Sequence, residues 1–168
     1  MPLLAIADRE LADVDPRRLS TTELVRHIVS RHHQYLRDML PFVQVLAHRV
    51  ARVHGQQEPK LVELSGAVAE LRATLEPHLD DEERSLFPAL VANAGVAVAR
   101  SKDLRALQDE HLHVEEMVKQ LRALSNDFVV PDWASTSYRT LMRELEKLEA
   151  DTLAHVHTEN HVLMARFV

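Results

Sequence analysis

Two short segments of the chain combine histidine and glutamate at a spacing suited to metal binding. His78 is followed four residues later by Glu82, and His155 is followed four residues later by Glu159. Side chains four residues apart lie on one face of an α-helix, so each pair would aim an imidazole and a carboxylate in the same direction. A single His-x-x-x-Glu pair is a weak signal, because a solvent-exposed helix rich in these residues produces it by chance.

The composition limits which atoms could bind a metal. The 168 residues contain no cysteine and 11 histidines. Disulfides, thiolate zinc sites and cysteine-ligated iron–sulfur clusters are therefore excluded within this chain. Any metal must be bound through nitrogen and oxygen, and histidine is the residue type that stands out.

The elements that would carry these residues are four long helices. A capping box at Ser20 to Glu23 opens the first helix, which we expect Pro41 to kink without ending it. Short loops between long helices make neighbours antiparallel, so we expect an all-α, up-down-up-down four-helix bundle. Residues 20–168 would form this single domain and residues 1–19 an N-terminal arm. The expected helices run from about 20 to 54, from 59 to near Pro88, from near 101 to 127, and from about 135 towards the C-terminus.

The predicted helix ends place four histidines at one level of the bundle. His33, His78, His111 and His155 each lie 10 to 12 residues from the same end. At a rise of about 1.5 Å per residue, all four would lie roughly 15–18 Å from that end. His54 is 21 residues from His33, or about 30 Å along a continuous helix, so we expect it to cap the far end of the first helix.

Four imidazoles and two carboxylates exceed the four ligands that one zinc ion usually takes. They suit two first-row metal ions, each with two histidines and both sharing the carboxylates of Glu82 and Glu159. Imidazole with carboxylate favours iron or manganese over calcium or magnesium. A ferritin-like site needs two Glu-x-x-His pairs, and only Glu110 with His113 provides one here.

These residues lie in four segments that resemble a known family. HIVSRHHQYLRDMLP (27–41), HLDDEERSLFP (78–88), EH (110–111) and HVHTEN (155–160) are similar to segments of hemerythrin-like di-iron proteins, in particular the iron-sulfur cluster repair family, also called repair of iron centres. The resemblance covers about residues 20–164. It implies two iron ions (Fe2+/Fe3+) with an oxo or hydroxo bridge. The ligands it implies are His33, His78, Glu82, His111, His155 and Glu159.

The sequence also departs from related patterns. Full-length members of the repair family carry an extra N-terminal domain with cysteines, which has no counterpart here. Oxygen-carrying hemerythrins have a His-x-x-x-His on the third helix and a histidine followed five residues later by Asp on the fourth, where this chain has Glu115 and Asn160. Glu115 is either an added ligand or, as we favour, an outward or supporting acid.

The resemblance implies a function in repair of damaged iron–sulfur clusters under nitric oxide or oxidative stress. The small ligands would be nitric oxide or dioxygen, the protein partners iron–sulfur apo-proteins, and the activity iron donation or nitric oxide reduction, with no catalytic side chain assigned. The alternatives are a hemerythrin-like dioxygen carrier or sensor and a bundle whose histidines are only structural. The net charge of −6 argues against nucleic-acid binding, and the sequence shows no membrane span or signal peptide, so we expect a cytoplasmic protein.

Lesser expectations concern the neighbours of the candidate ligands. We expect His32 to be interfacial or exposed and the pair His157 and His161 to lie on the surface. Tyr35 and Glu110 are candidates to orient ligand imidazoles through their free N–H groups. We expect Asp80, Asp81 and Glu83 to be the more ordinary solvated acids, with any that lies near the metal able to tune its field. LFP (86–88) would pack the end of the bundle that shields the metal.

Overall fold

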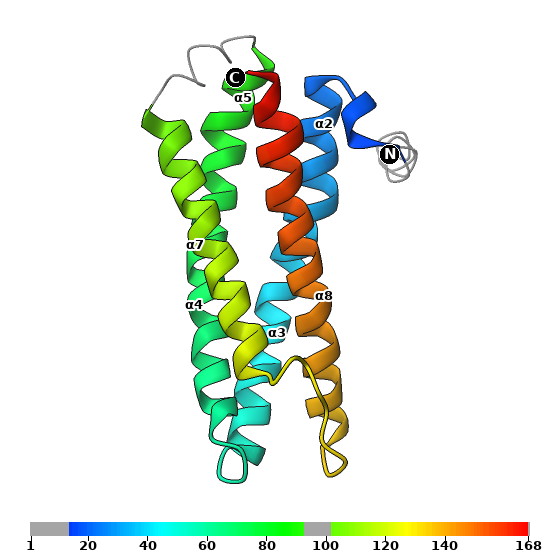
Figure 1. The fold of residues 1–168 in the computed structure, drawn as a ribbon, viewed down its shortest axis with the longest axis vertical. Helices are drawn as coiled ribbons and strands as arrows, with labels where there is room; N and C mark the ends of the chain where they lie inside the picture. The colour runs from blue at the N-terminus through cyan, green and yellow to red at the C-terminus, as the bar shows by residue number, and fades with distance from the viewer. Residues whose placement is uncertain (1–13, 93–101, 168) are drawn as a thin grey trace.

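Four helical rods run side by side in the computed structural model, which describes residues 14–92 and 102–167 (Figure 1). Rod one comprises α2 (Thr21–Ile28), η2 (Val29–His33) and α3 (Gln34–His54). Rod two comprises α4 (Lys60–Asp81), η3 (Glu82–Leu86) and α5 (Phe87–Val91). Rod three is α7 (Lys102–Leu124), and rod four comprises α8 (Thr136–Thr158), η4 (Glu159–Leu163) and η5 (Met164–Arg166). A short 3-10 helix, η1 (Pro16–Arg18), precedes them.

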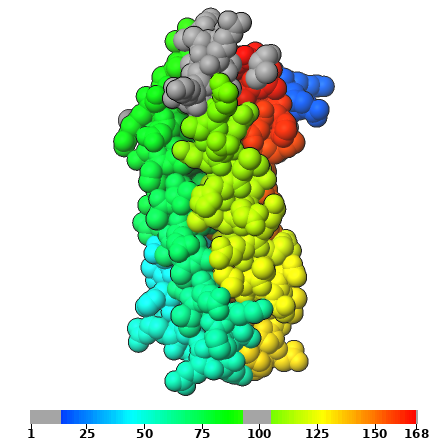
Figure 2. All heavy atoms as spheres, turned by 60° about the vertical axis from the view of Figure 1, so that its left-hand side comes forward, coloured from blue at the N-terminus to red at the C-terminus, as the bar shows by residue number. Residues whose placement is uncertain are grey.

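The arrangement is the all-α, up-down-up-down bundle that the sequence predicts. The loops that follow α3 and α7 lie at one end of the bundle, and the last residues of the chain lie at the other, beside α2 and α5 (Figure 1). Figure 2 shows α4 and α7 running side by side along one face. Within residues 14–92 and 102–167, no helix is both long enough and apolar enough to cross a membrane.

Local signals set the helix starts. The capping box is present, since the backbone N–H of Glu23 donates to Ser20 Oγ at 3.3 Å and the backbone N–H of Ser20 donates to Glu23 Oε2 at 2.8 Å. Ser135 caps α8 in the same way, accepting from the backbone N–H of Tyr138 at 3.3 Å. These bonds satisfy backbone donors that a helix start leaves unpaired.

Prolines interrupt the rods less than the sequence suggests. Pro41 lies inside α3, which continues to His54, as expected. The second rod was expected to stop near Pro88, but Pro88 lies in the first turn of α5 and the helix continues to Val91. A proline is tolerated in a first turn because its missing N–H has no intrahelical partner there.

The apolar core consists of two clusters. The larger one fills the half of the bundle towards the α3–α4 and α7–α8 loops, with Leu64, Leu71, Leu141 and Leu145 at 0 or 1% exposure. The smaller cluster closes the opposite end and includes Leu24, Ile28, Phe87 and Leu163. Of the predicted arm, Leu19 belongs to this smaller cluster, and residues 1–13 lie outside the described residues, as do most of the expected connector and the third helix start, at 93–101.

Candidate metal centre

A layer of buried histidine and glutamate side chains occupies the interior of the bundle at the level of the π turns. All six residues that the sequence singles out lie in it, and each is 6% exposed or less. They come from all four rods. The set is His33, His78, Glu82, His111, His155 and Glu159.

One half of this layer is formed by rods one and four. His33 Nε2 and His155 Nε2 lie 3.1 Å apart. His33 Nε2 is 3.4 Å from Glu82 Oε2 and 3.6 Å from Glu159 Oε1. His155 Nε2 lies 2.9 Å from the same Oε1 atom of Glu159.

The other half is formed by rods two and three. His78 Nε2 and His111 Nε2 lie 3.2 Å apart. Glu82 Oε1 lies 3.3 Å from His78 Nε2, and Glu159 Oε2 lies 3.2 Å from His111 Nε2. Each carboxylate therefore directs one oxygen to each half of the layer. The two glutamates are common to two sets of four donor atoms, each set lying within 4.8 Å.

The donor atoms fit a bound cation better than a hydrogen-bond network. Both oxygens of Glu82 and of Glu159 are buried and make no regular hydrogen bond within the described part of the chain. A buried carboxylate that makes no regular hydrogen bond is costly unless a positive charge lies beside it. Two ligands at right angles on a metal, each about 2.1 Å from it, would lie about 3 Å apart, close to the separations seen here. Nitrogen and carboxylate oxygen donors suit first-row transition metals.

Three π turns lie at the level of this layer. His33 is the last residue of η2, Glu82 is the first of η3, and Glu159 is the first of η4. A π turn inserts an extra residue into a helix and shifts the side chains that follow it around the helix axis. These turns let rods one, two and four point their ligands inward while the apolar residues beyond still face the smaller core cluster.

Three of the four imidazoles are oriented by hydrogen bonds at their Nδ1 atoms. Nδ1 of His33 lies 2.9 Å from Glu83 Oε1, which also accepts from Arg37 Nη2 at 3.1 Å. Nδ1 of His78 lies 2.8 Å from Glu110 Oε2. Such partners fix the ring orientation and leave Nε2 free to bind a metal.

For His111 the orienting partner is Asn160, whose Oδ1 lies 2.9 Å from Nδ1. Glu110 was anticipated from the sequence, but Asn160 was noted only as a departure from the oxygen carriers. The expectation that Glu83 is an ordinary solvated acid is wrong. Glu83 was missed because sequence spacing within the second rod does not show that it faces His33 on the first.

In the metal-free layer, protonated imidazoles surround the buried carboxylates. Burial opposes the charged forms of His33 and His111, but contacts with Glu159 and Glu82 outweigh it and raise both imidazole pKa values to about 10. Burial and the negative Glu159 would raise the pKa of Glu82, but contacts with His111, His33 and His78 lower it to about 2. Protons on the imidazoles thus neutralise the buried carboxylates, and a cation binding there must displace them.

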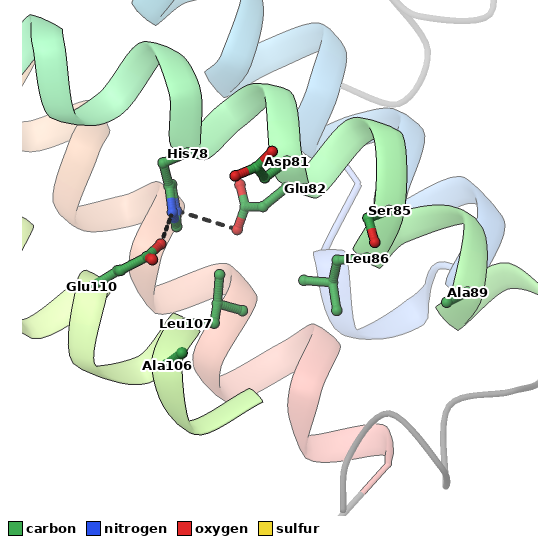
Figure 3. Close-up of a pocket in the computed structure, with 9 residues that line it drawn as sticks. All are labelled: His78, Asp81, Glu82, Ser85, Leu86, Ala89, Ala106, Leu107 and Glu110. Carbon is green, nitrogen blue, oxygen red and sulfur yellow. Dashed lines mark hydrogen bonds and ion pairs between the residues drawn. The ribbon is translucent and has the colours of Figure 1, made fainter. Parts of the chain in front are cut away.

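The surroundings of the layer differ on its two sides. The Phe87 ring lies against the His33 ring with centroids 5.5 Å apart. Of the LFP segment, Phe87 packs this end as expected, Leu86 is half-buried against it and Pro88 is exposed. On the other side, a pocket of about 380 Å³ reaches His78 and Glu82 between α4 and α7. In Figure 3 the side chains of His78, Glu82 and Glu110 converge there, with Leu86 and Leu107 beside them. A small molecule could approach the layer along this route.

The remaining histidines do not join the layer. His54 is the last residue of α3, far from the layer, as its distance from His33 along the helix predicts. Its Nε2 lies 2.9 Å from Ser135 Oγ. His157 and His161 are exposed and pack together at 4.7 Å between centroids. His32 is buried at 4% exposure in the interface with α8, rather than exposed. Glu115 is half-buried and belongs to neither set of donors.

Comparison with known proteins agrees with this geometry. The sequence profile of the hemerythrin HHE cation binding domain matches residues 24–167. The iron-sulfur cluster repair protein DnrN of Neisseria gonorrhoeae is 32% identical over 142 residues, covering 84% of this chain and 88% of the relative. The iron-sulfur cluster repair protein ScdA of Staphylococcus haemolyticus is 29% identical over 164 residues, covering 96% of this chain and 74% of the relative.

A third relative, the iron-sulfur cluster repair protein YtfE of Dickeya chrysanthemi, is 27% identical over 164 residues, which covers 98% of this chain and 73% of the relative. The profile match, over residues 24–167, extends through all four rods. The chain therefore belongs to the hemerythrin HHE cation binding domain family, among the relatives named as iron-sulfur cluster repair proteins.

Proposed function

We propose that this protein binds two iron ions in its buried layer and uses them to repair damaged iron–sulfur clusters. The observation that carries the proposal is the division of each glutamate between two donor sets. Glu82 directs Oε2 towards His33 and Oε1 towards His78, and Glu159 directs Oε1 and Oε2 in the corresponding way. One carboxylate with an oxygen at each of two metal positions is a bridging ligand.

The proposed ligands follow from that division. His33 and His155 would bind one ion, His78 and His111 the other, and Glu82 and Glu159 both, with an oxo or hydroxo bridge completing the pair. Two irons bound in this way supply one-electron redox chemistry and labile iron. Imidazole and carboxylate hold iron less tightly than thiolates do, which suits delivery of iron to an acceptor.

The side chains of this protein would have three tasks in such a role. Glu83, Glu110 and Asn160 orient three of the imidazoles. Phe87 excludes water beside His33. The pocket at His78 admits small ligands, for which we propose nitric oxide or dioxygen. The proposed setting is the cytoplasm, with iron–sulfur apo-proteins as the partners, in keeping with the names of the relatives.

Asn160 favours repair over the alternative of a dioxygen carrier. Its side chain is committed to His111, while Glu159 supplies the carboxylate that reaches both donor sets. Glu115, which stands where oxygen carriers have a further histidine, lies outside both sets. A carrier of the hemerythrin type would lack one of its histidine ligands here.

An iron-transfer assay tests the proposal. The iron-loaded protein is mixed without air, in the presence of a thiol reductant, with an acceptor enzyme whose [4Fe–4S] cluster has lost one iron by oxidation, and the recovery of acceptor activity is followed. Recovery should exceed that given by the same amount of free Fe2+ in the presence of a weak chelator, and the Glu82→Leu variant should give none. Equal recovery from free iron, or reversible oxygen binding without transfer, would contradict a repair function.

A further inference from the structure

His155 differs from the other three imidazoles of the layer. Its ring is 1% exposed, and its Nδ1 atom is buried without a hydrogen-bond partner in the described part of the chain. The corresponding atoms of His33, His78 and His111 lie 2.8–2.9 Å from side-chain oxygens. An imidazole that binds metal through Nε2 carries its proton on Nδ1, so a buried Nδ1–H without an acceptor needs an explanation.

Two further buried polar atoms without a hydrogen bond belong to residues that line the groove between rod one and α8. They are the hydroxyl of Tyr35 and Oδ2 of Asp151. Both residues line a groove of about 630 Å³ between rod one and α8, and Ala154, the neighbour of His155, lines it too. Within the described residues, these two atoms and His155 Nδ1 are the buried side-chain atoms without a hydrogen bond, apart from the four carboxylate oxygens of the layer.

His32 connects these groups. Its ring is stacked on the His155 ring at 5.6 Å between centroids and 17° between planes. Its Nδ1 lies 2.9 Å from Asp151 Oδ1. Asp151 precedes His155 by four residues, so the two side chains share a helix face. One oxygen of Asp151 is thus fixed by the ring that covers His155, and the other oxygen is left for a partner in the groove.

Tyr35 adds a third group to this set. Its buried hydroxyl has no hydrogen-bond partner in the described part of the chain. A phenol hydroxyl can both donate and accept a hydrogen bond. A donor on His155, an acceptor on Asp151 and a hydroxyl on Tyr35 together offer the two to four polar partners that a bound water molecule requires.

We propose that Asp151 and Tyr35 are positioning residues for His155, acting through a small hydrogen-bonding molecule of the size of water held in this groove. His155 Nδ1–H donates to that molecule, which donates to Asp151 Oδ2 and contacts the Tyr35 hydroxyl. His32 holds Asp151 in place through Oδ1. The inference rests on the proposed function, because it takes His155 to be an iron ligand.

The proposed arrangement affects how tightly iron is bound and how fast it is released. Three imidazoles are anchored directly by the protein, and His155 is anchored through an exchangeable molecule. The iron position shared by His33 and His155 therefore depends on the molecule held beside Asp151 and Tyr35. Loss of an orienting partner typically weakens metal binding by about 10–100-fold, so changes in this groove should speed the release of iron without removing a ligand.

The test compares groove variants with matched variants at the far end of the bundle. Asp151→Leu and Tyr35→Phe are paired with Asp132→Leu, in the exposed loop before α8, and with Tyr138→Phe, in the first turn of α8. Tyr138 precedes His155 by 17 residues, or about 25 Å of helix. Each protein is loaded with iron without air, its iron is counted, and the rate of iron loss to a ferrous chelator is measured.

Asp151→Leu should load two irons and lose iron at least about ten-fold faster than the unchanged protein. Tyr35→Phe should show an acceleration of about three-fold, as expected for one hydrogen bond, and Asp151→Asn, which keeps a polar group facing His32, should fall between Asp151→Leu and the unchanged protein. Rates equal to those of the two control variants would overturn the inference. A protein that loads no iron even when unchanged would instead overturn the proposed function.

A second readout separates positioning from general loosening. The imidazole N–H protons of iron-bound histidines give strongly shifted proton resonances in the diferrous protein. Asp151→Leu should move one of the four resonances and leave three in place, because only His155 is anchored through the groove. Movement of all four, or of none, would overturn the assignment, even if the rate of iron loss changed.

Discussion

The half of the bundle nearer the α3–α4 and α7–α8 loops consists of regular helices around an apolar core, whereas the ligand layer interrupts three of the four rods with π turns. The first half buries leucines such as Leu71 and Leu141 completely. The layer buries six ionisable side chains together at one level of the bundle. Apolar burial stabilises a fold, and burial of charge without a counter-charge destabilises it.

This difference indicates that folding stability and metal binding depend on different parts of the bundle. The apolar half can hold the helices in register while the layer adopts whatever spacing the ligands require. The smaller cluster beyond the layer, with Phe87 and Leu163, then seals the end. Changes in the two regions should accordingly affect different measurements.

Glu159→Leu should abolish stoichiometric iron binding. The substitution removes an oxygen from each donor set at once, and no other carboxylate of the described residues belongs to both sets except Glu82. Helix content measured by circular dichroism should be retained, because the core below the layer is untouched. Iron binding at the unchanged level would show that Glu159 does not bridge.

Leu71→Ala should lower the free energy of unfolding by about 2–5 kcal/mol, the range for large-to-small changes in a packed core. Leu71 is fully buried in the larger cluster. Leu153→Ala, at a position 41% exposed, should change stability by less than about 0.5 kcal/mol. Folded Leu71→Ala protein should still bind two irons per chain. A loss of iron in proportion to the loss of stability would contradict the idea that the apolar half and the metal layer act separately.

The pH dependence of the stability of the metal-free protein should chiefly report the layer, which holds the groups with large shifts of pKa at its centre. His33 and His111 have pKa values raised to about 10 from 6.5, so their contribution to stability is complete below pH 6.5 and is lost as the pH rises towards 10. Glu82 has a pKa lowered to about 2 from 4.5, so its contribution is complete above pH 4.5 and is lost as the pH falls towards 2.

Urea unfolding at a series of pH values should therefore show greatest stability of the metal-free protein between about pH 4.5 and 6.5. The iron-loaded protein should not lose stability on the alkaline side in the same way, because metal replaces the protons. Iron affinity should increase with pH over the range in which the imidazoles titrate. A metal-free protein that gains stability from pH 7 to 9 would contradict the claim that protonated His33 and His111 stabilise the layer.

Gly66→Ala should raise the free energy of unfolding slightly, by about 0.5–1 kcal/mol. Gly66 lies inside α4 on the exposed side, and an added Cβ would meet nothing within 4 Å. Iron content and the rate of iron release should stay unchanged. A change in either would show that the apolar half and the layer are coupled more closely than their separate cores indicate.

Much of this architecture could be predicted from the sequence. Helix starts follow local rules, so Ser20 and Ser135 could be placed correctly. The level of each histidine depends mainly on the rise per residue, so counting along the helices predicts that His33, His78, His111 and His155 meet. Their convergence with Glu82 and Glu159 follows from the four-residue spacing.

What could not be predicted depends on contacts between rods. The partnership of Glu83 with His33 spans 50 residues, and that of Asn160 with His111 spans 49. The π turns have no local signature, because they arise where ligand geometry and core packing demand different registers. Sequence spacing left His32 either interfacial or exposed, and its contact with Asp151 on α8 decides for the interface.

The pairing of two irons within the layer is the central claim, and Mössbauer spectroscopy of protein loaded with 57Fe without air, with the iron counted per chain, tests it most directly. After oxidation, two irons per chain should form one antiferromagnetically coupled diferric pair that gives no electron paramagnetic resonance signal. One iron per chain, or two irons that behave as isolated high-spin ferric ions, would contradict bridging by Glu82 and Glu159.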